Sequence, residues 1–188
     1  MALIVVSAIA SRFWIESIHE RVLGAAEHPW NEGTARLKID FGGRDALVEL
    51  YRALLHAEGR RDLPHYSQLV PLAKIVYLPF PWVPSATPIL RGTAREPSFV
   101  GNSLELSAQL RAMGITLKNA LGALPEVPNR VPPVELSTSS ASAGRERVKA
   151  TWLALSYAAW LSVETKTPLH GIYGEDETTY PEENWQLE

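Results

Sequence analysis

The chain has 188 residues, of which 46% are hydrophobic and 21% charged, and this length and composition suit one globular domain. It contains no cysteine, which excludes disulfides, thiolate metal sites and cysteine nucleophiles and suits a reducing compartment. The net charge of −3 argues against nucleic-acid binding, and no apolar run reaches the ~20 residues of a membrane span. We therefore expect a cytoplasmic protein that contacts neither nucleic acid nor membrane.

The charge is unevenly distributed along the chain. Residues 171–188 carry six acidic residues and no Lys or Arg, whereas residues 1–170 carry 15 acidic and 18 basic residues. This asymmetry predicts a single globular domain over residues 1–170 and an acidic C-terminal tail over residues 171–188.

The sequence pattern of the N-terminal part of the chain predicts both helix and strand. Residues 1–10 are apolar but lack a basic n-region, so a buried strand or helical turn is favoured over a signal peptide. Residues 11–27 have the spacing of an amphipathic helix, and residues 35–41 alternate strictly between apolar and polar side chains, as a half-buried strand does. Whether residues 1–10 form strand or helix is left open by their pattern.

Three further segments predict helices. Residues 44–58 carry a continuous leucine-rich stripe with Gly59 placed to end it. Asn102 and Glu105 have the spacing of a capping box before a helix whose core positions include Leu106 and Leu110. Residues 145–164 place Trp and Leu on a wide stripe, which predicts a helix near the centre of the fold.

Proline-rich segments separate these helices. Two loops are expected near residues 79–98 and 125–144, and the segment 66–78 before the first is ambiguous between helix and buried strand. The sequence thus predicts a mainly α fold, with α+β as the alternative, made of four to five helices and a minor strand or hairpin.

Signatures of catalysis do not occur in the sequence. It has no phosphate-binding loop, nucleophile elbow, dinucleotide fingerprint or calcium loop, and no pair of His residues at metal-binding spacing. We therefore predict no catalytic residue, no metal site and no cofactor. The alternative is an enzyme whose site is assembled from distant residues, and its first candidates are Asp40, His56 and His65.

Aromatic residues next to proline or acidic residues are the candidates for binding a partner. Trp82 lies in a proline-rich aromatic stretch, which serves either as a rigid platform for a partner or as a loop folded over the core. The tail interleaves aromatic and acidic residues, which serve either to meet a basic protein surface or to solvate the terminus. The predicted partner-binding residues are Trp82, Tyr173, Glu175, Asp176, Glu177, Tyr180, Glu182, Glu183 and Trp185.

The chain as a whole resembles small immunity proteins encoded beside bacterial polymorphic toxins. The resemblance is carried by the cysteine-free body, by the stretch 100–106 before a helix and by a late helix ending in residues 162–169. It implies a protein that binds and silences a toxin without catalysis. Besides the enzyme, a subunit of a phage particle or multiprotein complex is the other alternative.

Overall fold

The computed structural model describes residues 2–6, 37–40, 45–69, 75–79, 99–130, 135–137 and 144–173. The described strands are β1 (Ala2–Val6), β2 (Leu37–Asp40), β3 (Ile75–Leu78), β4 (Phe99–Asn102), β5 (Glu135–Ser137) and β6 (Leu169–Tyr173). The described helices are α2 (Asp45–Glu58), α3 (Ser103–Leu121) and α4 (Arg145–Thr165), with a short 3-10 helix, η2 (Pro64–Tyr66).

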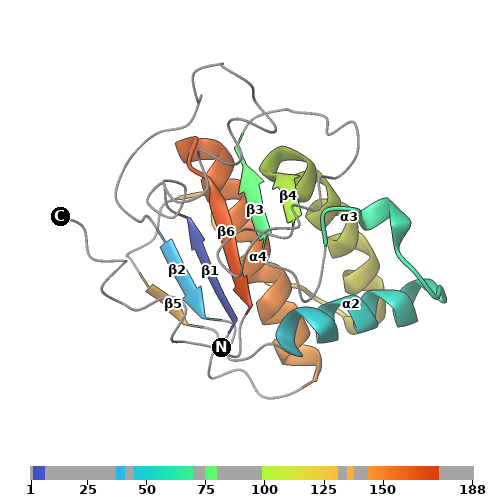
Figure 1. Ribbon diagram of the computed structural model, residues 1–188. Coiled ribbons are helices and arrows are strands. Elements are labelled where there is room, and N and C mark those ends of the chain that lie inside the picture. Colours follow the sequence, from blue (N-terminus) through green and yellow to red (C-terminus); the bar gives the residue numbers. More distant parts are fainter. Residues whose placement is uncertain are drawn as a thin grey trace.

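The six strands form one mixed sheet in the order β4-β3-β6-β1-β2-β5 (Figure 1). The central strands run antiparallel to their neighbours, while β4 is parallel to β3 at one edge and β5 is parallel to β2 at the other. Ile4 in β1 pairs with Ile39 on one side and Gly171 on the other. The two ends of the described chain therefore meet in the middle of the sheet.

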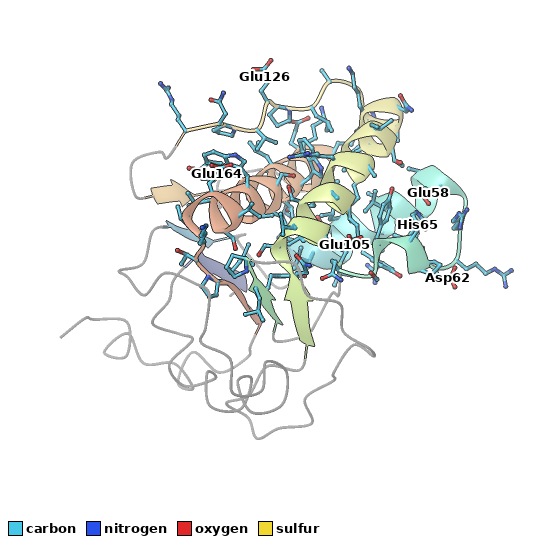
Figure 2. The ribbon with its side chains drawn as sticks, turned by 90° about the horizontal axis from the view of Figure 1, so that it is seen from above. Glu58, Asp62, His65, Glu105, Glu126 and Glu164 are labelled. Atoms are coloured by element: carbon cyan, nitrogen blue, oxygen red, sulfur yellow. The ribbon has the colours of Figure 1, made fainter. Side chains whose placement is uncertain are left out.

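The three helices lie together on one side of the strands (Figure 2). α4 contacts β1 and β6, α3 contacts β4, and α2 packs against both α3 and α4. α4 is consequently enclosed along most of its length, and its buried side chains are Val148, Thr151, Trp152, Ala154, Leu155, Ser156, Tyr157, Ala158, Ala159, Leu161 and Ser162. The prediction that this helix is central is confirmed.

Side-chain hydrogen bonds fix the elements around α4. The indole Nε1 of Trp152 donates to the carbonyl of Leu110 at 2.9 Å, and the Tyr157 hydroxyl donates to the carbonyl of Arg130 at 3.0 Å. The first bond joins α4 to α3, and the second joins α4 to the segment that follows α3. Both bonds satisfy polar atoms that burial would otherwise leave unpaired.

The prediction of a mainly helical fold with a smaller strand component is confirmed. Three α-helices lie within the described residues, fewer than the four to five expected, and the expected helix over residues 11–27 lies outside them. Residues 2–6 form a strand, the segment 66–78 ends in β3, and β5 lies in the second proline-rich region. The sheet is larger than the minor strand or hairpin expected, because short segments distant in sequence pair with one another.

The predicted helix ends agree closely with those observed. α2 ends at Glu58, and Gly59 follows with a φ of +62°. The Asn102 side chain caps α3 by accepting from the backbone N–H groups of Leu104 and Glu105. The capping box is only half formed, since the N–H of Asn102 donates to Gln68. Among the helices of the described residues, none combines the length and apolarity needed to cross a membrane.

Candidate functional site

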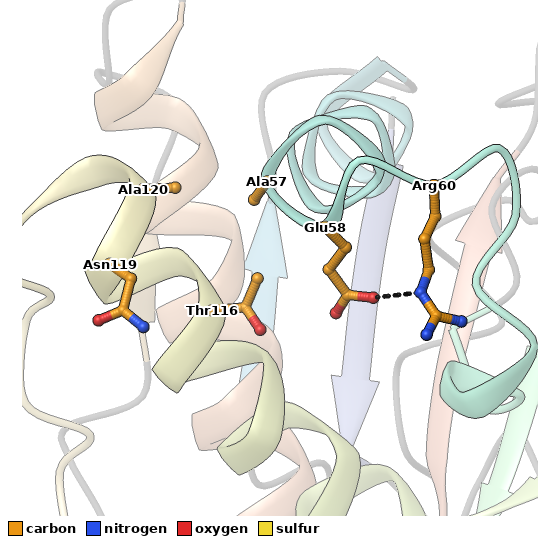
Figure 3. Close-up of a pocket in the computed structure, with 6 residues that line it drawn as sticks. All are labelled: Ala57, Glu58, Arg60, Thr116, Asn119 and Ala120. Atoms are coloured by element: carbon orange, nitrogen blue, oxygen red, sulfur yellow. Dashed lines mark ion pairs between the residues drawn. The ribbon is translucent and has the colours of Figure 1, made fainter.

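A pocket of about 510 Å³ lies between the end of α2 and the last turns of α3. In Figure 3, Ala57, Glu58 and Arg60 line one side and Thr116, Asn119 and Ala120 the other. Small or polar side chains from α2, from the turn after it and from α3 thus line a solvent-open hollow.

Glu58 is the charged residue with the most partners in this pocket. Its Oε2 lies 3.0 Å from Nε2 of His65 and 3.7 Å from Nε of Arg60, and Tyr66 also hydrogen-bonds to its carboxylate. Figure 2 places Glu58 and His65 side by side at the end of α2. The turn at Gly59 brings η2 back against α2, and this return brings the His65 and Tyr66 side chains to Glu58.

The pKa of Glu58 lies below its ordinary value of 4.5. Burial by itself raises this pKa, but the hydrogen bonds from Tyr66 and His65 and the charges of His65 and Arg60 outweigh the burial. Glu58 is therefore an anion at neutral pH.

Tyr66 connects Glu58 to α3. Burial raises the pKa of the Tyr66 hydroxyl, and its hydrogen bond to Glu58 and the Glu58 charge raise it further, so it stays protonated. A carboxylate only accepts hydrogen bonds, so the Tyr66 proton goes to Glu58. Thr116 also hydrogen-bonds to Tyr66 and lowers its pKa, as a donor to the phenolic oxygen does. Thr116 thus donates a hydrogen bond to Tyr66, and Tyr66 donates one to Glu58.

Ile115 is a close neighbour in α3 of residues that line the pocket. Its relative exposure is 68%, the larger of the two values for exposed large hydrophobic residues in the described part of the chain, the other being 38% for Leu104. It directly precedes Thr116 and lies one helical turn before Asn119, both of which line the pocket. An exposed branched apolar side chain therefore lies beside two residues that line the polar hollow.

A second polar cluster, at the start of α3, is fully occupied by internal bonds. Gln68 uses its backbone N–H to donate to Oε1 of Gln109 and its own Oε1 to accept from the N–H of Asn102, each at 2.9 Å. Its carbonyl accepts from the hydroxyl of Tyr77. A Cβ on Gly101 would lie 2.5 Å from Oε1 of Gln68, so the cluster is tightly packed. These groups join β3, β4 and α3 and serve the fold.

The residues proposed for an assembled catalytic site lie on three different elements. Asp40 is the last residue of β2, His56 is exposed on α2, and His65 follows the turn after α2, where its partner is Glu58. Within the part of the chain that the structure describes, no group of three or more His, Cys, Asp or Glu could hold a metal ion.

Most of the predicted partner-binding residues lie outside the described residues. These are Trp82 and the tail residues Glu175, Asp176, Glu177, Tyr180, Glu182, Glu183 and Trp185. Tyr173 instead ends β6, where it pairs with Ala2 of β1. The predicted boundary after residue 170 therefore falls inside β6.

None of the pocket residues was predicted from the sequence, although the pattern around Ile115 indicates an exposed position. The buried positions Met113 and Leu117 each lie two residues from it, which places Ile115 on the opposite face of the helix. Glu58 and Thr116 had no such signal, since 58 residues separate them in sequence.

Comparisons of the chain with protein-family models, with curated proteins and with solved structures find no match.

Proposed function

We propose that this protein works by binding another protein through its pocket surface, defined as Ile115 together with the six residues that line the pocket. The observation that carries the proposal is the 68% exposure of Ile115, which directly precedes Thr116 and lies one helical turn before Asn119, two residues that line a polar pocket. Protein interfaces combine an apolar anchor with a rim of polar groups, and this surface has both.

The chemistry of Glu58 supports binding over catalysis. A general base that works near neutral pH needs a pKa raised toward that pH. The hydrogen bonds and charges around Glu58 lower its pKa instead, which makes the carboxylate a weaker base and a persistent anion. A persistent anion suits the recognition of a partner.

The partner we propose is a bacterial toxin, which this protein would inhibit in the cytoplasm as an immunity protein. This follows the resemblance of the chain to immunity proteins and the acidic aromatic composition of residues 174–188. Glu58 adds a second negative group to the surface offered to such a partner.

Co-expression with the product of the neighbouring open reading frame tests the proposal. We expect the neighbour to arrest growth when expressed alone and growth to recover when this chain is present. A neighbour that is harmless alone, or that stays toxic beside this chain, would contradict the immunity role. A ring or other large homo-oligomer in sizing chromatography would instead favour the alternative of an assembly subunit.

A further inference from the structure

We infer that the pocket between α2 and α3 receives a basic side chain, lysine or arginine, from the protein partner. This inference rests on the proposed protein-binding function and assigns the chemistry of its central contact. It follows from the acceptors in the pocket, from the loose contact of the Glu58 carboxylate with Arg60 and from the apolar side chains of the walls.

The pocket offers hydrogen-bond acceptors. The Glu58 carboxylate only accepts, and the Thr116 hydroxyl has already given its single proton to Tyr66, so its oxygen also faces an occupant as an acceptor. The Asn119 amide has an acceptor oxygen as well as two N–H donors, and the Arg60 guanidinium only donates. The Glu58 carboxylate and the Thr116 oxygen can thus accept from an occupant, and a cation donates to a carboxylate most strongly.

Arg60 leaves room for a competing cation. Its Nε lies 3.7 Å from Oε2 of Glu58, which is too long for a hydrogen bond, and its side chain is 57% exposed. The Glu58 side chain is only 15% exposed and keeps the shorter contact with His65. An incoming ammonium or guanidinium group can displace this loose exposed partner while the His65 and Tyr66 contacts remain.

The pocket walls match the aliphatic part of such a side chain. Ala57 and Ala120 present methyl groups on the two sides of the hollow (Figure 3). Lysine and arginine bury their methylene chains along apolar surface while the charged group reaches a polar one. The exposed Ile115, next to Thr116 in α3, adds apolar surface beside these walls.

Titration with small amino-acid probes tests the assignment without any partner protein. We expect N-acetyl-L-arginine amide to produce saturable NMR shifts in the backbone amides of residues 57–60 and 116–120. N-acetyl-L-glutamine amide, a neutral probe, should shift these amides at least about tenfold less at equal concentration. The Glu58→Gln substitution keeps the size of the side chain and should lower the arginine response by a similar factor. An equal response to the neutral probe, a stronger response to N-acetyl-L-glutamate amide, or a response that survives Glu58→Gln would overturn the inference.

A second variant keeps the test independent of Glu58. Ala120→Leu fills the pocket from its other wall and should abolish the arginine response, whereas Ala108→Leu, on an exposed part of α3 away from the pocket, should leave it unchanged. An arginine response retained in Ala120→Leu also overturns the inference. These titrations contain no partner protein, so a negative result excludes recognition of a basic side chain at this pocket. Protein binding itself is tested separately by the co-expression experiment.

Discussion

Gly114 and Trp152 show how one missing side chain sets a helix contact. A Cβ on Gly114 would lie 2.8 Å from Cζ2 of Trp152, closer than real Cβ atoms approach. The indole therefore lies against the backbone of α3, and its Nε1 reaches the carbonyl of Leu110. At Gly114 the close approach matters more than the preference of helices for other residues, and the helix continues through it.

The substitution Gly114→Ala is expected to destabilise the protein. Alanine gains about 1 kcal/mol in helix propensity, while overpacking costs about 1–3 kcal/mol. We expect a net loss of about 1 kcal/mol in the free energy of unfolding, measured with guanidinium chloride. In the Trp152→Phe background the same Gly114→Ala substitution should cost less, because the smaller side chain leaves room for the new Cβ. If Gly114→Ala costs the same with Trp152 intact as in the Trp152→Phe variant, the contact does not limit the position.

Glu58 gives a pH dependence whose sign follows from its pKa. The folded-state pKa lies below the ordinary 4.5, so ionised Glu58 stabilises the fold above that pH, and this stabilisation is lost as the pH falls through the folded pKa. Glu58→Gln should lower the free energy of unfolding at pH 7 by about 0.5 kcal/mol, because the group is partly solvated. Unfolding curves of both proteins should converge as the pH falls below 4.5. A difference that stays constant down to acid pH would contradict this.

At the scale of elements, two buried serines hold the start of α3 against the end of α4. The hydroxyl oxygens of Ser103 and Ser162 lie 2.7 Å apart, and Ser162 also donates to the carbonyl of Thr167 at 2.7 Å. A hydroxyl has one proton, so Ser103 has to be the donor to Ser162. Ser162 therefore links two elements and the turn after α4.

This direction of donation predicts unequal effects of two similar substitutions. Ser162→Ala leaves the buried Ser103 proton without its acceptor and the Thr167 carbonyl without its donor, and should cost about 2 kcal/mol. Ser103→Ala removes only one donor to Ser162 and should cost about 0.5 kcal/mol. Thermal or denaturant unfolding of the two variants measures the difference. Equal losses, or a larger loss for Ser103→Ala, would reverse the assigned direction.

The helices could be predicted from the sequence because their signals are local. The leucine stripe of α2, the Asn102 cap of α3 and the wide stripe of α4 each lie within a few helical turns. The sheet order could not be predicted, because β1 pairs with β6 across most of the chain and strands of three to five residues carry little periodicity. Only Ile115 of the pocket surface carried a local signal, since Glu58, Tyr66 and Thr116 meet through the turn after α2 and the packing of α2 against α3.

At the scale of the whole molecule, the sheet and helices leave the pocket surface open. α4 lies at the centre of the helical layer, whereas the outer face of α3 is exposed from Leu104 to Asn119. The two exposed large hydrophobic residues of the described chain lie at opposite ends of this face, about 16 Å apart along the helix. Ile115 directly precedes a residue that lines the pocket, whereas Leu104 lies about three helical turns away, so Leu104 serves as the control for Ile115.

The affinity of this chain for the purified product of the neighbouring open reading frame is the measurement that tests protein binding at the pocket surface most directly. Calorimetry should give a dissociation constant at least about tenfold larger for Ile115→Asp than for the unaltered chain, and a nearly unchanged constant for Leu104→Asp. Both variants place one acid on an exposed position of the same helix, and melting temperatures check that both fold. Equal affinities for Ile115→Asp and the unaltered chain, or no binding by the unaltered chain, would contradict the proposed function.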